Sequence, residues 1–273
     1  MRTLTLCAAM AMVGFANAGT WTFTLDGGSL VSLENAAVSL TANGNIAYGN
    51  DTVSGGAAQI ATLTQNGTPS LDPLFSLANP IGGNGGGTRT NQYSVLLDVN
   101  IPAGGFHSLF QTGSSHDSAG ATNSGPNDND GDWFLNGSNG MGISSDYSDA
   151  GNSTAFTPGA WTRIILTIDT NTASGTAAYS SYVNGTLQNV VQSPSSWGQD
   201  GRYSLGSIMS FFADEDSELR SPFGVNNIVL FDTTLTAQEA AAFGGATASA
   251  PVPEPMTIGV LAVGLLALRR KRK

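Results

Sequence analysis

Hydrophobic and polar residues alternate in short runs along most of this chain, and Gly, Asn, Ser, Thr and Pro separate the runs. Alternation with a period of two is typical of β-strands, because successive side chains point to opposite faces of a sheet. In the run from Trp161 to Ile168, one face is almost entirely apolar and the other is mixed. We therefore expect this strand to be covered on both faces for part of its length.

The alternating runs and the turn residues between them predict strands at Trp21–Leu25, Ala37–Thr41, Gln59–Thr64, Tyr93–Ile101, Phe106–Thr112, Asp132–Asn136, Met141–Ser144, Trp161–Asp169, Ala177–Val183, Leu187–Gln192, Tyr203–Phe212 and Val225–Phe231. Many short strands at this spacing favour a two-sheet sandwich. The predicted fold class is therefore all-β.

Turn and cap residues locate the connections. Asn184-Gly185 predicts a tight hairpin, because both residues readily adopt the positive φ values that a two-residue turn needs. Thr236, with Glu239 three residues on, predicts the start of one short helix that ends before Gly244. The glycine-rich segment 81–87 has no helix or lysine after it, so we predict a loop there and no phosphate-binding cradle.

The N-terminal segment has the three parts of a secretory signal peptide. One basic residue, Arg2, precedes an apolar stretch, and the small residues Ala16 and Ala18 stand before a predicted cut at Gly19. The only cysteine, Cys7, lies inside this segment. We therefore predict a signal peptide over residues 1–18, removed by signal peptidase, and a mature chain without disulfides.

The C-terminal segment combines Pro253, Glu254 and Pro255 with an apolar run from Met256 to Leu268 and five terminal basic residues. A helix of that run would be about 20 Å long at ~1.5 Å per residue, short of a hydrocarbon core of ~30 Å. This arrangement resembles the PEP-CTERM sorting signal. The resemblance implies a processing partner of the exosortase type, a transient inner-membrane anchor and a final place at the surface or in the extracellular matrix of a Gram-negative type bacterium. A plain tail anchor is the alternative.

The segment between the two ends is strongly acidic. Of the ten basic and twenty acidic residues in the chain, four arginines and nineteen acids fall within residues 19–252, which gives a net charge of −15. Such a surface repels phosphate backbones, so nucleic acid is not an expected partner. Divalent cations and neutral glycans remain compatible with it.

Several local patterns together resemble the LamG-like, concanavalin A-like jelly-roll domains. These are the Pro158-Gly159-Ala160-Trp161 strand entry, the Tyr182-Val183-Asn184-Gly185 hairpin and the closing strand 225–231 that leads into the helix. The resemblance covers about residues 90–245 and implies a jelly-roll sandwich. Asn184 and Asn226-Asn227 stand where the family often has carboxylates, which removes those groups from any calcium or catalytic role.

Two acidic clusters are candidates for chemistry. Asp128, Asp130 and Asp132 flank Gly131 and could supply oxygen ligands to calcium, although Asp, Asn and Gly also simply form good turns. Asp214, Asp216 and Glu218 would share one face of an extended strand. Laminarinase-type glycoside hydrolases of the same fold class carry a similar array, with carboxyl groups ~5–5.5 Å apart for a retaining mechanism. A metal-binding or structural turn is the other interpretation of this second cluster.

Aromatic and imidazole side chains give the remaining candidates. Trp133 and Trp197 lie beside Asp and Gly and could stack on sugars, or be partly buried at the ends of the sandwich. Trp161 is predicted to be in the core. His107 and His116 could ligate a metal together with Asp117, although surface positions are the simpler interpretation.

We therefore predict a signal peptide (1–18), a LamG-like jelly-roll domain (19–245), a linker (246–252) and a sorting segment (253–273). The predicted function is carbohydrate binding or a structural role at the cell surface, without enzymatic activity. Extracellular polysaccharide is the expected ligand, no cofactor is required, and calcium is the candidate ion. A glycoside hydrolase and a passive matrix component are the alternatives.

Overall fold

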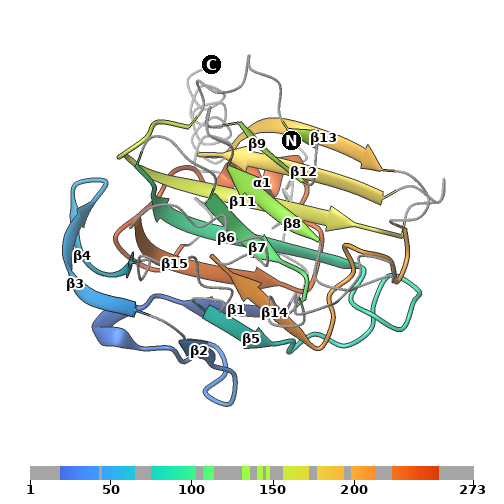
Figure 1. The fold of residues 1–273 in the computed structure, drawn as a ribbon, viewed down its shortest axis with the longest axis horizontal. Helices are drawn as coiled ribbons and strands as arrows, with labels where there is room; N and C mark the ends of the chain where they lie inside the picture. The colour runs from blue at the N-terminus through green and yellow to red at the C-terminus, as the bar shows by residue number, and fades with distance from the viewer. Residues whose placement is uncertain are drawn as a thin grey trace, which may run out of the picture.

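A computed structural model describes residues 19–42, 45–64, 75–102, 107–113, 131–135, 140–143, 146–147, 156–171, 177–193, 198–212 and 223–251. Two antiparallel β-sheets form a sandwich in these ranges (Figure 1). None of the helices described has the length and apolar character needed to cross a membrane. The predicted signal peptide and sorting segment lie outside the described residues.

The larger sheet has eight strands in the order β13-β12-β11-β6-β15-β4-β3, and β1 also pairs with β15. Its strands are β1 (Thr20–Phe23), β3 (Asn45–Val53), β4 (Gly56–Thr64), β6 (Gln92–Asn100), β11 (Trp161–Asp169), β12 (Ala177–Val183), β13 (Thr186–Ser193) and β15 (Phe223–Phe231).

The smaller sheet has seven strands in the order β10-β9-β8-β7-β14-β5-β2. Its strands are β2 (Leu40–Ala42), β5 (Phe75–Ala78), β7 (His107–Gln111), β8 (Asp132–Leu135), β9 (Met141–Ile143), β10 (Asp146–Tyr147) and β14 (Ile208–Phe211). A short 3₁₀ helix, η1 (Asp26–Gly28), follows β1, and an α-helix, α1 (Ala237–Ala242), follows β15.

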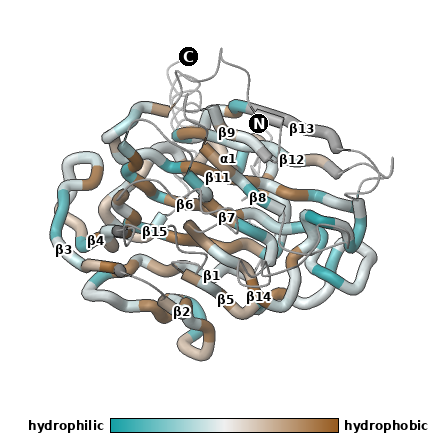
Figure 2. The backbone as a smooth tube through the Cα atoms, viewed as in Figure 1, coloured by the Kyte–Doolittle hydropathy of each residue, from teal (hydrophilic) through white to brown (hydrophobic). Residues whose placement is uncertain are grey.

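The main hydrophobic core lies between the two sheets. Hydrophobic positions concentrate on the central strands of the sandwich (Figure 2). The alternating side chains Tyr93, Val95, Leu97 and Val99 of β6 all belong to this core. The predicted all-β sandwich is therefore confirmed.

The larger sheet is also covered on its outer face. Leu96 of β6 and Ile165 of β11 pack with Leu235, Ala240 and Phe243 in a second buried cluster around α1. The prediction that the strand from Trp161 is covered on both faces is confirmed, because α1 returns over the face that the mixed residues occupy.

The turn and cap predictions are confirmed as well. Asn184 and Gly185 have φ values of 48° and 79° between β12 and β13. Thr236 accepts a hydrogen bond from the backbone N–H of Glu239, whose side chain accepts from the backbone of Thr236, and together they form a capping box for α1.

The segment predicted to be a linker is packed over the part that the structure describes. Ala246 is buried with Val53, Ala58 and Ile60 of the β3–β4 hairpin. The backbone oxygen of Thr247 accepts a hydrogen bond from Asn226 of β15 at 2.6 Å. Residues 246–249 therefore lie against the sandwich.

Candidate functional site

Three connections meet at one end of the sandwich and form what we call the polar rim: residues 79–91 between β5 and β6, residues 169–171 after β11, and residues 198–206 between β13 and β14. In Figure 1 the first and third of these loops lie side by side at the right edge of the view. The glycine-rich segment predicted to be a plain loop is part of this rim.

Asp200 holds the glycine-rich loop in place. Its carboxylate accepts the backbone N–H groups of Thr88 and Arg89, each at 2.9 Å, and the Thr88 hydroxyl at 3.0 Å. The side-chain amide of Asn91 donates to the same carboxylate at 3.0 Å. These donors, led by the Thr88 backbone N–H, hold the pKa of Asp200 well below its usual range because they stabilise the charged form.

Below the carboxylate, Asn91 joins the three loops from a buried position. Its side-chain oxygen accepts the hydroxyls of Thr170 and Ser204, both at 2.6 Å, and the backbone N–H of Asp200 at 2.7 Å. Asn91, Thr170 and Ser204 are each at most 1% exposed. A fully bonded buried network of this kind fixes the loops relative to one another.

Glycine lets the loop backbone approach its neighbours closely. A Cβ atom at Gly87 would lie 2.2 Å from the Asp200 carboxylate, so no larger residue fits there. A Cβ atom at Gly86 would lie 3.1 Å from Nε2 of Gln199 and 3.5 Å from Nδ2 of Asn171. The side-chain amides of Gln199 and Asn171 therefore both lie beside the exposed backbone of Gly86.

These two amides are available to a ligand. Gln199 and Asn171 are exposed, and neither side-chain amide makes a hydrogen bond within the part of the chain that the structure describes. An amide supplies both donors and acceptors, which suits the hydroxyl groups of a polyol. The rim thus combines a rigid base with freely accessible neutral polar groups.

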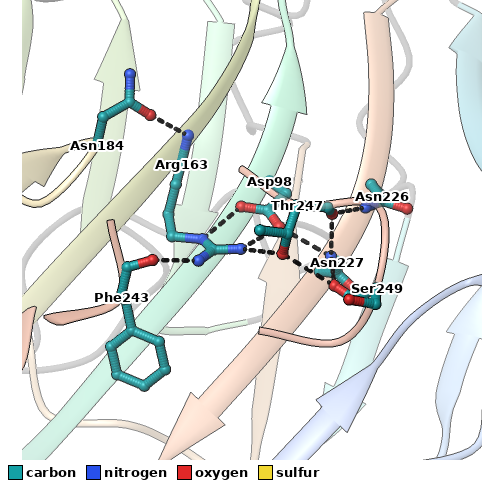
Figure 3. A network of polar contacts seen from close by, with 8 residues as sticks. All are labelled: Asp98, Arg163, Asn184, Asn226, Asn227, Phe243, Thr247 and Ser249. Carbon is teal, nitrogen blue, oxygen red and sulfur yellow. Dashed lines mark hydrogen bonds and ion pairs between the residues drawn. The ribbon is translucent and has the colours of Figure 1, made fainter. Parts of the chain in front are cut away.

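A second polar cluster lies on the outer face of the larger sheet (Figure 3). Arg163 of β11 and Asp98 of β6 form a bidentate ion pair, with both nitrogen–oxygen distances 2.8 Å and both side chains at most 1% exposed. Arg163 also donates to the backbone oxygen of Phe243 and to the hydroxyl of Thr247. Asn227 donates to Asp98 at 2.8 Å.

This second cluster is structural. It ties two central strands to the end of α1 and to residues 247–249, and its charges are covered from solvent. Asn184 and Asn227, which stand where LamG-like domains often have carboxylates, belong to this cluster. Asn184 accepts the backbone N–H of Arg163, and Asn227 donates to Asp98. Amides fit here because additional carboxylates would crowd Asp98 with like charge.

The structure corrects the expectation for several candidate residues. Trp133 lies on β8, is 2% exposed and packs edge-on against Tyr179 in the core, so its ring is not presented for stacking on a sugar. Asp132 is also on β8, is 4% exposed and pairs with Gln111, so it does not belong to a solvated ligand loop. His107, for which a surface position was the simpler interpretation, is 2% exposed and packs against Phe223.

Trp161 is only partly buried, and its indole N–H donates to Asp51 at 3.1 Å. The expectation that Trp161 lies in the core therefore holds only in part.

The remaining candidate residues lie outside the described ranges: Asp128, Asp130, Asp214, Asp216, Glu218, Trp197, His116 and Asp117. Within the described ranges, no three His, Cys, Asp or Glu side chains gather closely enough to hold a metal ion. In sequence, Trp197 immediately precedes Gly198, where the third loop of the polar rim begins.

The sequence contained two signals for the polar rim. The run Gly82-Gly83-Asn84 followed by Gly85-Gly86-Gly87 indicates a loop whose backbone comes close to other groups, and Asn91 directly precedes a strongly apolar strand. Neither signal identifies Asp200 as the partner, because that residue is 109 positions from Asn91.

A scan against protein-family models and a search of the curated proteins found no match. Among solved structures, the binding domain of Paraclostridial Mosquitocidal Protein 1 aligns with a TM-score of 0.52 at 9% identity, over 81% of this chain and 50% of that one. The receptor binding domain of botulinum neurotoxin D aligns with a TM-score of 0.50 at 12% identity, over the same shares.

Domain 4 of AbnA, a GH43 extracellular arabinanase from Geobacillus stearothermophilus, aligns with a TM-score of 0.47 at 16% identity, over 82% of this chain and 97% of that one. This chain spans about half the length of the two toxin domains. At these identities, the two toxin-domain alignments establish a shared β-sandwich fold and nothing finer.

Proposed function

We propose that this chain is an exported cell-surface module that binds an extracellular glycan through its polar rim. The observation that carries the proposal is the pair of exposed amides, Gln199 and Asn171, which both lie beside the exposed backbone of Gly86. Sugar hydroxyls are bound in proteins by hydrogen-bond donors and acceptors held in fixed positions. The Asp200 and Asn91 hydrogen bonds supply that rigidity.

Two further features support this proposal. Trp197 adjoins the rim in sequence, and an indole ring is the type of group on which sugar rings stack. The two toxin domains that share the fold are named as binding domains. The N-terminal and C-terminal segments resemble export and PEP-CTERM sorting signals, and the proposal assigns the central sandwich to the LamG-like jelly-roll class.

The test is a glycan array probed with residues 19–252, which include every described residue, in the presence of calcium and then of a chelator. We expect retention of at least one polysaccharide. Replacing both Gln199 and Asn171 with Ala should weaken binding about tenfold or more, since each hydrogen bond contributes roughly 1 kcal/mol. Gln59→Ala, which removes an exposed amide of β4 outside the rim, should leave the affinity unchanged.

Three outcomes would change this assignment. Absence of any retained glycan, or equal affinity of the double variant and the wild type, would contradict binding at the rim. Calcium-dependent binding that is lost when Asp128 and Asp130 are changed to Asn would move the site to that loop. Release of reducing sugar by the wild type, abolished in Glu218→Gln, would make the protein a glycoside hydrolase.

A further inference from the structure

Among the strands that the structure describes, β3 forms one edge of the larger sheet and pairs with β4 alone. It pairs with β4 through nine consecutive residue pairs, from Asn45 opposite Thr64 to Val53 opposite Gly56, without a bulge. The turn between them is the two-residue pair Ser54-Gly55, with φ values of 48° and 87°. In such a hairpin the residues flanking the turn, Val53 and Gly56, exchange both of their backbone hydrogen bonds.

The turn geometry fixes which backbone groups of β3 face outward. Hydrogen-bonded and non-bonded pairs alternate along an antiparallel ladder, so every second residue counted back from Val53 bonds to β4. The N–H and C=O groups of Ile46, Tyr48, Asn50 and Thr52 therefore point away from the sheet; we call them the β3 edge. Within the described part of the chain, the one hydrogen bond to these groups is from the Thr52 N–H to Asp51, at 2.7 Å.

The β3 edge lacks the features that usually keep sheet edges from pairing. Proteins protect such edges with lysine, proline, bulges or inward-pointing charges. The run Asn45–Val53 has no lysine or proline, and Asp51 is its single charged residue. Its residues from Ala47 to Thr52 are exposed. Nothing on the strand itself opposes the addition of another strand.

We propose that the β3 edge pairs with the β3 edge of a second copy of this chain, antiparallel about a two-fold axis at Gly49. Tyr48 of each copy then lies opposite Asn50 of the other, and outward backbone groups meet outward groups as the ladder requires. The two eight-stranded sheets join into one continuous sheet. Such an isologous contact is the commonest way in which two identical subunits associate.

Charge and size favour this register. Asp51 of each copy lies opposite Ala47 of the other, and the two Asp51 residues are four positions apart along the ladder. At ~3.4 Å per residue that separation is about 14 Å, beyond a screening length of ~8–10 Å at physiological salt. Gly49 faces Gly49 where the strands come closest, and a Cβ atom there would have no neighbour within 4 Å in the single chain.

A disulfide at Gly49 tests the register directly. Directly opposed residues of a non-bonded pair have Cα atoms ~4.5 Å apart, within the range that a disulfide spans. In the full chain with Cys7→Ser, Gly49→Cys should form a covalent dimer under mild oxidation. Ala57→Cys, which is also exposed but lies on β4 behind the edge, should not form one. Equal cross-linking of the two variants would overturn the proposed register.

Charge substitutions at Ala47 give an independent measurement by sedimentation equilibrium of the full chain. Ala47→Lys places a cation opposite Asp51 of the other copy and should lower the dimer dissociation constant roughly 2- to 30-fold, whereas Ala47→Asp should raise it similarly. The same two substitutions at Ala57 measure the effect of net charge alone and should change the dimer dissociation constant much less.

Raising the salt concentration should strengthen the wild-type dimer, because the chain is acidic overall. A wild type that stays monomeric throughout, or equal effects at positions 47 and 57, would overturn the proposal.

Discussion

Two aspartates show how the surroundings of a single residue set its chemistry. Burial raises the pKa of Asp98 above its usual range, and the Arg163 guanidinium and the Asn227 amide oppose that shift. Asp200 lies nearer the surface and accepts backbone and side-chain N–H groups, so its pKa is lowered. The first residue holds strands together from inside, whereas the second uses its charge to fix a loop.

Asp200 should make the stability of the rim dependent on acid. Its folded-state pKa lies below the unfolded value of ~3.9, so its contribution is present above that pH and is lost as the pH falls below it. Asp200→Asn should lower the free energy of unfolding by about 1–3 kcal/mol at pH 7, through weaker hydrogen bonds to Thr88 and Arg89. Asn tolerates the left-handed backbone at this position, where φ is 55°.

The measurement is the melting temperature of both proteins between pH 7 and pH 2.5. The gap between wild type and Asp200→Asn should be constant near neutral pH and should narrow progressively below about pH 4. A gap that stays constant over that range would show that the charge on Asp200 contributes nothing to the rim.

At the scale of the element, each hairpin turn depends on glycine to a different degree. Gly55 and Gly185 both have positive φ, at 87° and 79°. A Cβ atom at Gly55 would have no neighbour within 4 Å, whereas one at Gly185 would lie 2.9 Å from the backbone oxygen of Ala241 in α1. The β12–β13 turn is therefore also a packing contact with the helix.

The two glycines form a matched pair for a stability measurement. Gly55→Ala should cost about 1–2 kcal/mol, from backbone strain alone. Gly185→Ala should cost roughly 1–3 kcal/mol more, because the end of α1 must also shift. Urea unfolding of residues 19–252 measures both values. Equal losses in the two variants would show that the contact with α1 yields without cost.

At the scale of the whole molecule, the chain after β15 returns over the larger sheet and is fastened there. Phe243 packs against Phe231, and the Phe243 and Thr247 groups bond to the buried Arg163. Removing Arg163 alone would leave Asp98 buried without its charge partner, an arrangement that costs several kcal/mol in proteins. The C-terminal part of the described chain therefore belongs to the folded unit.

The proposed export and sorting predict the mass of the mature protein. We expect protein recovered from the surface of its native host to begin at Gly19 and to lack Arg269–Lys273. The physical reason is that an apolar run of the length of residues 256–268 is short for a permanent membrane span, and we therefore propose that it serves as a processing signal. Intact-mass spectrometry measures this, and a Glu254→Ala variant should retain the tail. Surface protein that still carries the five basic residues would contradict the sorting proposal.

Sequence patterns predicted the long central strands of the larger sheet. β6, β11 and β15 were located within one or two residues, because alternating apolar side chains record which face of a strand meets the core. The Asn184-Gly185 turn and the Thr236 cap were predicted for the same kind of reason. Their determinants lie within four residues of one another in the chain.

Strands without that local pattern were missed. β3 is exposed over most of its length, so its sequence does not alternate between apolar and polar residues, and β5 is only four residues long. Trp133 was expected near a loop, yet its strand places it in the core. The face that a short strand buries depends on its partners in the sheet, here β7 and β9, and not on its own residues.

By itself, the sequence determined the all-β class, the central strands, the one described α-helix and its cap, because each follows from propensities and spacings over a few neighbouring residues. The tertiary structure alone decided the polar rim and the buried Asp98–Arg163 pair. Asp200 meets Asn91 across 109 residues, and Arg163 meets Asp98 across 65. Contacts between positions so far apart are set by how the strands are ordered in the two sheets, which no local pattern of hydrophobic and polar residues encodes.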